Sequence, residues 1–333
     1  MEADAVNSTS DLRRLAFLIG LLLLALAAAI LVGVTFGASG AGLRTLFGPE
    51  ATARRIVIGI RLPRVLVAAL EGAALAIAGL TFQTLLRNPL ADPFILGVSG
   101  GAASGAAVGI AFGIARRHPA AIPLLSFAGA CGATAAVFLL ARRRRGVDPV
   151  RLILSGLVLN SFFSAVILVS LSLSPNSDLT VAFRWMIGNL AGASWNDVVV
   201  LAVSLAIALV VLIWFSNDLR LFAFGEEDAS ARGVAVERVK LAGYATASLL
   251  TGAAVAVSGI IGFVGLLVPH LVRMAWRRDY RHLLPLSALA GAVLLVSSDV
   301  VSRTIAPPLE LPIGALTAFL GVPFFLLLLR REI

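Results

Sequence analysis

Long apolar runs recur along this chain, and short polar or basic segments separate them. The first run extends from Leu15 to Phe36, and a helix needs about 20 apolar residues to cross the hydrocarbon core of a bilayer. Apolar residues make up 59% of the sequence and charged residues only 14%, whereas soluble domains contain roughly 25% charged residues. We therefore predict an integral membrane protein whose main partner is the lipid bilayer.

The apolar runs leave little chain for a soluble domain, so residues 1–333 are predicted to form a single, all-α, polytopic membrane domain. The longest polar loop, 216–240, is part of it. The ten predicted spans are 15–36, 62 to a turn at 87–93, 94–114, 120–141, 152–173, 198–215, 241–259, a run through Pro269 to the basic cluster at 277–281, 283–305 and 311–329.

The arginine clusters predict an orientation. If the first span starts inside, 18 basic residues lie on the inner side and 9 on the outer side, as the positive-inside rule requires. Both termini are then cytoplasmic. The net charge of +9 is spread over short clusters that flank apolar runs, which is typical of membrane proteins. No nucleic-acid partner is predicted.

One segment returns later in the chain. GAALAIAG at 72–79 reappears as GAAVAVSG at 252–259, and Pro89 and Pro269 follow the two copies at the same distance. The predicted topology sends the second span inward and the seventh outward, so the two halves would be inverted, as in transporters with a central pathway. A chance match between two Ala/Gly-rich segments is the alternative. The small residues would let neighbouring helices approach closely, which predicts a packing helix inside a bundle.

No catalytic or metal-binding residue is predicted. Lys240 is the only lysine and is followed by Leu241, so a Walker A motif is absent. The three histidines share no ligand spacing, and Cys131 is the single cysteine. We expect no cofactor bound by this chain.

Glu71 is the unexpected residue of the second span. It lies about 15 Å into the span at 1.5 Å per residue from Arg61. An ionisable group at that depth costs about 2.5 to 3.5 kcal/mol and usually faces the bundle interior. It suits a hydrogen bond to a neighbouring helix, or, alternatively, an ion-coupled secondary transporter with inverted repeats. A lone carboxylate without an obvious relay favours the hydrogen bond.

Five stretches of the chain resemble a known family, the permease subunits of ABC importers for iron chelates, haem and vitamin B12 (the FecCD-type family). They are RLPR at 61–64, RNPLADP at 87–93, ILGVSGGA at 95–102, GFVGLLVPHLVR at 262–273 and LPIGALTAFLGVPFF at 311–325. They occur in the family's order and span nearly the whole chain.

The resemblance implies a fold like that of the vitamin B12 permease, with ten helices per subunit and a homodimer around one pathway. It further implies two cytoplasmic ABC ATPase subunits, which carry ATP and magnesium, and one extracytoplasmic substrate-binding protein. The location would be the bacterial cytoplasmic (inner) membrane. The expected function is inward transport of an iron chelate, either a siderophore or haem, or of cobalamin.

The resemblance also implies functional residues at both membrane faces. Arg61, Arg64 and Arg303 match outer positions that meet the binding protein, and Asp299, four residues before Arg303, could pair with it on the helix surface. The coupling element that docks into the ATPase matches Gly225, Glu226, Glu227, Asp228, Ala231, Arg232 and Gly233. The residues alone favour a solvated loop helix, because acidic residues suit its start and Gly233 its end, and only the resemblance assigns the coupling role.

Two further sets are predicted along the pathway. Asp148, Pro149 and Val150 match the place where the family narrows its pathway at the cytoplasmic end; initiation of a helix is the simpler reading. The pathway candidates are Asn160, Phe163, Arg184 and Trp185. For Arg184 and Trp185, anchoring at the membrane interface is the alternative.

Overall fold

The structure is a computed structural model that describes residues 2–36, 51–118, 120–143, 146–276, 279–307 and 309–332. Within these ranges the chain is almost wholly helical. Among the described residues, seven helices are long and apolar enough to cross a membrane: Asp11–Thr35, Arg54–Leu85, Ala121–Ala141, Pro149–Leu173, Trp195–Trp214, Val236–Ser258 and Tyr280–Thr304. Three shorter apolar helices, Val98–Ala111, Val264–Ala275 and Ile313–Leu327, correspond to the remaining predicted spans.

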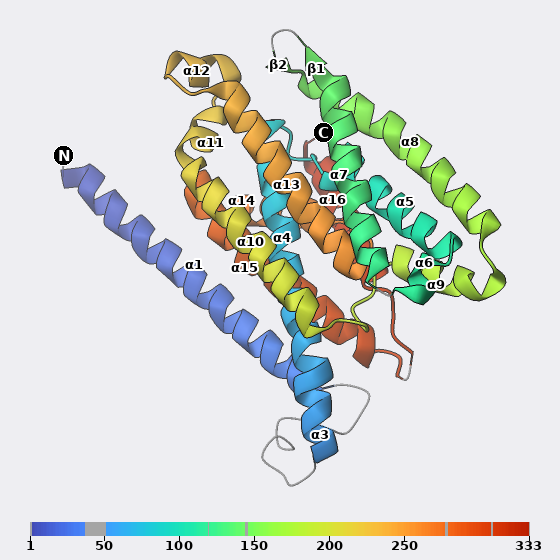
Figure 1. Ribbon diagram of the computed structural model, residues 1–333. Helices are drawn as coiled ribbons and strands as arrows, with labels where there is room; N and C mark the ends of the chain where they lie inside the picture. Colours follow the sequence, from blue (N-terminus) through green and yellow to red (C-terminus); the bar gives the residue numbers. More distant parts are fainter. Residues whose placement is uncertain are drawn as a thin grey trace.

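The described elements follow one another in the order shown in Figure 1. The helices are α1 (Glu2–Thr35), α3 (Ala51–Ile56), the π-helix η1 (Val57–Arg61), α4 (Leu62–Leu85), the 3₁₀-helix η2 (Pro93–Leu96), α5 (Val98–Ala111), α6 (Ile114–Arg117), α7 (Ala121–Ala141), α8 (Pro149–Leu173), α9 (Asn176–Met186), α10 (Trp195–Trp214), α11 (Ser216–Phe222), α12 (Glu226–Ala231), α13 (Val236–Ser258), α14 (Val264–Ala275), α15 (Tyr280–Thr304) and α16 (Ile313–Glu332). Between α7 and α8, β1 (Arg142–Arg143) and β2 (Gly146–Val147) pair as an antiparallel hairpin.

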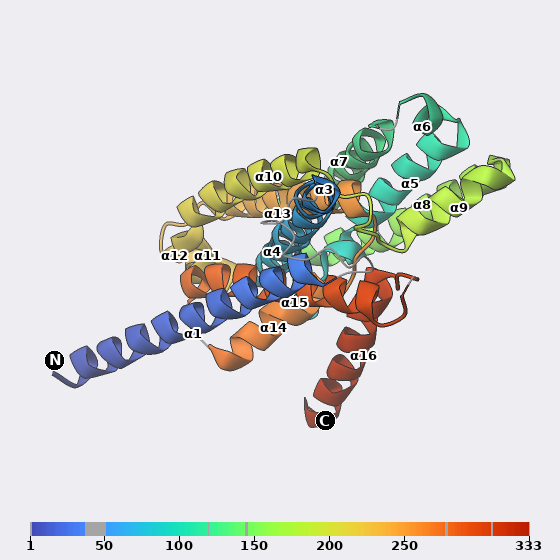
Figure 2. The same cartoon turned by 90° about the horizontal axis from the view of Figure 1, so that it is seen from below.

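Helix α4 forms the centre of the bundle. It packs against α10, α13, α14 and α15 (Figure 2), and 83% of its apolar window is buried inside the chain. Gly72 lies against the backbone of Gly291 on α15, and Gly79 lies against the backbone of Gly265 on α14, so that a Cβ atom at either glycine would collide. Close approach through small residues is how helices associate in lipid. The predicted packing helix is confirmed.

The two copies of the repeated segment lie on neighbouring helices that run in opposite directions. At the start of α13, Gly243 faces Thr81 and Leu85 near the end of α4. Farther along the pair, Ser258 at the end of α13 is hydrogen-bonded to Glu71 in the first half of α4. Figure 1 shows the same antiparallel arrangement. The two inverted halves predicted from the repeat therefore meet along α4 and α13.

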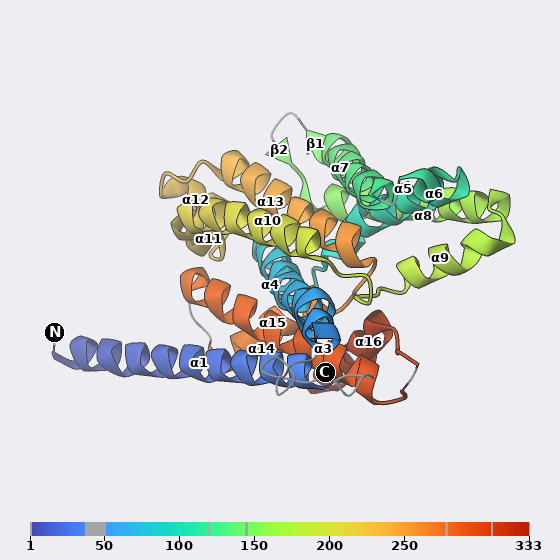
Figure 3. The ribbon, with the colours of Figure 1, turned by 60° about the horizontal axis from the view of Figure 1, so that its bottom comes forward.

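Helices α5, α7 and α8 pack together beside this centre (Figure 3). The predicted span 94–114 was too long, because Gly97 has a φ of 82° and separates η2 from α5. The remaining 14 residues of α5 extend about 21 Å at 1.5 Å per residue, which is less than the roughly 30 Å of a bilayer core. Gly97 and Pro93 thus turn this span into a short, interrupted helix.

The outer helices present apolar side chains outward. None of the apolar window of α1 is buried inside the chain, and only 17% of that of α8 is, as expected for surfaces that meet lipid. The bundle has two ends. The α12 end carries α11, α12 and the β1–β2 hairpin, and the α3 end carries α3, the end of α1 and the end of α15 (Figure 1).

Candidate functional site

Buried arginines cluster at the α3 end. Arg64 donates from Nε to Asp299 Oδ1 at 2.8 Å and, with both terminal nitrogens, to the two carboxylate oxygens of Glu310 at 2.9 and 3.1 Å. Arg303 Nε lies 3.3 Å from Asp299 Oδ2. The fork of Arg64 therefore joins α4, α15 and the segment after α15 through two carboxylates, a geometry that gives strong, directional pairs.

Arg61 and Arg303 also hold the end of α1. Arg61 donates to the carbonyl oxygens of Val34 and Thr35 at 3.1 and 2.9 Å, and Arg303 donates to the carbonyl of Gly33 at 2.6 Å. The last carbonyls of a helix have no partner within the helix and carry partial negative charge. Two arginines from elsewhere in the fold thus cap α1.

This geometry buries the three arginines that were predicted to meet the binding protein, and that docking role stays a prediction. Arg61, Arg64 and Arg303 are only 4%, 6% and 5% exposed, because their charges are satisfied inside the chain. The predicted pair between Asp299 and Arg303 is present, but it is buried instead of lying on the helix surface. Sequence reasoning missed Glu310, whose side chain is 38% exposed at the rim of the cluster.

At the α12 end, the segment from Gly225 to Gly233 forms the predicted short surface helix. Gly225 and Gly233 have φ values of 128° and 85° and bracket α12, which is the left-handed region that glycine adopts without strain. Glu227, Asp228, Ala231 and Arg232 are exposed. Glu226 is only partly exposed.

Glu226 meets Lys240, which sequence analysis treated only as the missing part of a nucleotide-binding motif. Lys240 Nζ lies 2.5 Å from Glu226 Oε2 and 3.6 Å from Glu237 Oε1. It also donates to the carbonyl of Val147 on β2 at 3.1 Å. The lysine side chain is 3% exposed. A single lysine thus contacts α12, α13 and the hairpin.

Asp148 directly follows the hairpin and begins α8. Its carboxylate accepts hydrogen bonds from the backbone N–H groups of Val150 and Arg151 at 3.0 and 3.3 Å, and Pro149 occupies the first helical position. These contacts are those of a helix N-cap. Helix initiation is confirmed, and the gate assignment of Asp148, Pro149 and Val150 stays a prediction.

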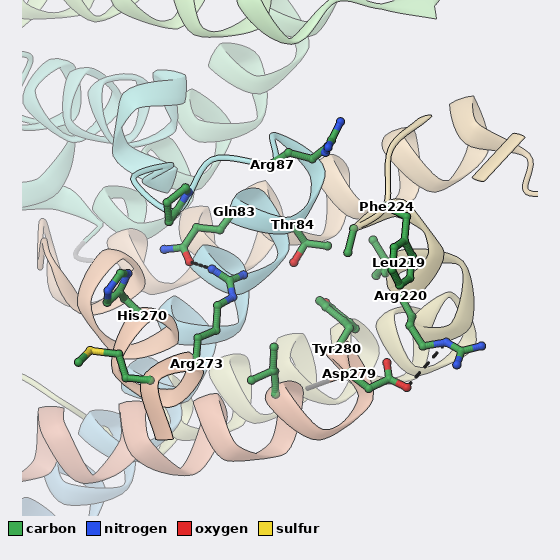
Figure 4. A pocket seen from close by; sticks show the side chains of 14 residues that line it. Gln83, Thr84, Arg87, Leu219, Arg220, Phe224, His270, Arg273, Asp279 and Tyr280 are labelled. Carbon is green, nitrogen blue, oxygen red and sulfur yellow. Dashed lines mark hydrogen bonds and ion pairs between the residues drawn. The ribbon is translucent and has the colours of Figure 1, made fainter. Parts of the chain in front are cut away.

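A cavity of about 850 Å³ opens at the α12 end between α4, α11, α14 and α15 (Figure 4). Arg87, Arg220 and Arg273 line it together with the acidic Asp279. Arg220 Nε lies 3.7 Å from Asp279 Oδ2, whereas Arg273 donates to the neutral Gln83 Oε1 at 2.6 Å. The described lining therefore carries an excess of positive charge.

The pathway candidates on α8 face their own subunit. Asn160 donates from Nδ2 to the carbonyl of Phe94 at 3.1 Å, and Gly100 on α5 lies against both Asn160 and Phe163. Phe162, which was not singled out, is 59% exposed on the other side. On α9, Trp185 is half-buried. The side chain of Arg184 lies outside the described part of the chain, and the pathway role of all four candidates stays a prediction.

Glu71 is fully buried and accepts a hydrogen bond from the Ser258 hydroxyl. Ser258 Oγ also lies 3.1 Å from the carbonyl of Ala254 on its own helix. Because Glu71 directly precedes the first copy of the repeat and Ser258 belongs to the second, the contact joins the two halves. The predicted hydrogen bond to a neighbouring helix is confirmed.

Comparison with known proteins gives consistent matches over most of the chain. Residues 21–331 match the FecCD transport family. The chain is 38% identical over 322 residues to the hemin transport system permease protein HmuU of Yersinia pestis, covering 95% of this chain and 96% of that protein. It is 42% identical to the cobalamin import system permease protein BtuC of Halobacterium salinarum, covering 86% and 77%.

A solved structure supports the same assignment. It is described as an inward-facing conformation of a metal-chelate type ABC transporter, and it superimposes with a TM-score of 0.84 at 30% identity, covering 95% of this chain and 99% of the other. The interrupted α5, the buried arginine cluster and the bracketed α12 all lie within the matched residues 21–331. This multi-pass membrane chain belongs to the FecCD transport family.

Proposed function

We propose that this chain is the membrane-spanning permease subunit of an ABC importer, which moves an iron chelate, as a siderophore complex or haem, or cobalamin inward across the bacterial cytoplasmic membrane. The observation that carries the proposal is the family match over residues 21–331, together with relatives named for hemin and for cobalamin transport that cover most of the chain. ATP hydrolysis takes place on a separate subunit, and this chain is not an enzyme.

The assembly that we propose contains two copies of this chain, two ATPase subunits at the α12 end and one binding protein at the α3 end. The α12 end is then cytoplasmic, as are both termini. Two features support ATPase docking there: the exposed acids Glu227 and Asp228 on α12 and the basic cavity beside α11. Surfaces that carry both charge signs can fix the register of a partner as well as attract it.

At the α3 end, burial changes the role that we propose for the arginines. Arg61, Arg64 and Arg303 hold together the surface that receives the binding protein. Direct pairing of Arg64 with an acidic group of that protein would require it to release Glu310, whose side chain is 38% exposed. Arg54 and Arg55 on α3 are exposed basic residues at the same end, and they are available for the first encounter.

The ion-coupled alternative receives less support from the site. It rested on Glu71, which is tied to Ser258 as expected of a structural contact. Among the described residues, no ion pair joins Glu71 to a second charged group that could form a relay.

Growth tests and reconstitution distinguish these functions. A strain that lacks this gene should lose growth in one of three tests, in which haem is the sole iron source, a ferric siderophore is the sole iron source, or vitamin B12 is the sole source of cobalamin. The intact gene should restore growth in that test. Purified complex in proteoliposomes should take up the same compound only with ATP inside. Uptake by this chain alone, driven by an ion gradient, would establish the alternative.

A further inference from the structure

Lys240 connects the proposed ATPase-coupling helix to the segment just before the proposed gate. Its Nζ contacts Glu226 of α12 at 2.5 Å and the carbonyl oxygen of Val147 at 3.1 Å. Val147 immediately precedes Asp148, which caps α8. Lys240 therefore connects α12 to the residue just before α8, although α8 and α12 are far apart in the sequence.

The backbone of Val147 is held on both sides. Its N–H donates to Glu237 Oε2 at 3.2 Å, and its carbonyl accepts from Lys240. Glu237 and Lys240 are themselves an ion pair at 3.6 Å, one turn apart on α13. Both backbone groups of Val147 are thus bound to side chains of α13, and these contacts hold the end of the hairpin against the start of that helix.

Burial distinguishes this lysine from the two acidic residues with which it pairs. The Lys240 side chain is 3% exposed, whereas those of Glu226 and Glu237 are 36% and 49% exposed. A buried ammonium requires partners for its charge and its three protons, and here the partners come from three elements. If α12 moves, Lys240 must either follow Glu226 or lose a charge-assisted bond in a site with little water.

We propose that Lys240 is a positioning residue that transmits movement of α12 to the start of α8, so that ATPase motion at α12 changes the opening at Asp148–Val150. This inference rests on the proposed function, because it needs an ATPase at α12 and a gate at the start of α8. It adds the physical connection between them: Glu226, Lys240 and Val147.

The test reads the gate directly and needs no transported compound. A Val150→Cys variant in a Cys131→Ala background is assembled with an ATPase variant that binds ATP without hydrolysing it. The rate of reaction with a polar maleimide is then measured with and without ATP. Couplings between sites in proteins commonly amount to about 5- to 150-fold, and we expect at least about fivefold between the two states.

Adding Lys240→Met should reduce the ATP effect on labelling to less than about twofold, while the complex still binds ATPase and ATP. Lys240→Arg should restore part of the effect, because it keeps the charge. Glu226→Gln should lower it without removing the buried lysine, which keeps the test informative if Lys240→Met fails to fold. Arg238→Met is the matched control: Arg238 is exposed on α13, two residues from Lys240, and this variant should retain the full effect.

The possible failures can be told apart. An undiminished ATP effect in folded Lys240→Met and Glu226→Gln complexes would overturn the relay and leave the permease assignment intact. An equal loss in the Arg238→Met control would overturn it as well, because the effect would not be specific to Lys240. If complexes with native Lys240 bind ATP but show no change at position 150, the gate assignment is wrong and the relay is overturned with it.

Discussion

Glu71 on α4 and Ser258 on α13 are hydrogen-bonded in the buried interior of the bundle, although 187 residues separate them in the sequence. Glu71 directly precedes the first copy of the repeat, and Ser258 lies within the second. The contact therefore joins the two inverted halves where side chains are otherwise small. A substitution at Glu71 can therefore test whether its carboxyl has a structural role or couples transport to an ion.

Glu71→Gln should leave ATP-driven uptake within about twofold of the native rate, since the amide oxygen can still accept from Ser258. An ion-coupled carrier would lose its titratable group, and with it the dependence of uptake on the ion gradient. Uptake into proteoliposomes, with ATP or with an imposed gradient, distinguishes the two cases. Loss of uptake by a folded Glu71→Gln complex that still hydrolyses ATP would contradict the structural role.

Asp299→Asn should destabilise the bundle by about 3 to 5 kcal/mol, because it leaves Arg64 and Arg303 buried without their shared carboxylate. Glu310→Gln is the matched control at the same arginine. Its side chain is 38% exposed, so its loss should cost only about 1 kcal/mol or less. Denaturant unfolding in mild detergent, followed by tryptophan fluorescence, measures both, and equal costs would argue against a buried role for Asp299.

Gly79→Ala should destabilise the protein by about 1 to 3 kcal/mol, since the added methyl group meets the backbone of Gly265 and α4 must shift. Gly132 on α7 is the control, because nothing lies within 4 Å of a Cβ atom built there. Gly132→Ala should be neutral or stabilising by up to about 1 kcal/mol. The same unfolding measurement applies. A neutral Gly79→Ala would show that the contact between α4 and α14 is loose.

Replacement of Glu227 and Asp228 by alanine should weaken ATPase binding by about tenfold, which corresponds to about 1.4 kcal/mol. Both side chains are exposed on α12, so unfolding of the permease should be unchanged. The loss should be larger at low salt, because exposed charge pairs are screened. Titration of labelled ATPase at two ionic strengths checks this, and an unaltered affinity would make α12 an ordinary solvated helix.

The sequence predicted the parts of the fold that depend on local composition. The lengths of the apolar runs located the ten segments. The small residues at 72–79 identified the central packing helix, because helices that pack this closely need small residues, and these are visible in the sequence. The depth of Glu71 predicted an inward-facing side chain for the same reason: lipid is too unfavourable a surrounding for it.

Contacts between segments far apart in the sequence could not be predicted from local composition. Arg64 meets Asp299 and Glu310 across 235 and 246 residues, so its burial could not be predicted from its neighbours in the sequence, and the family resemblance pointed to contact with a binding protein. The partners of Lys240 were hidden in the same way. Lys240 is the only lysine of the sequence, which was the one available signal, but this did not indicate which residues it contacts. Gly97 was visible as a glycine, but its left-handed backbone conformation depends on the packing around η2.

The separation between Glu71 and Ser258 also has a consequence during synthesis. At about 5 to 20 residues per second, the 187 residues between them take roughly ten to forty seconds to translate. For most of that interval α4 is already made, yet its carboxyl lacks Ser258 and its glycines lack their partners Gly265 and Gly291. The central helix of the finished bundle thus waits for its partners on α13, α14 and α15 while more than half of the chain is being made.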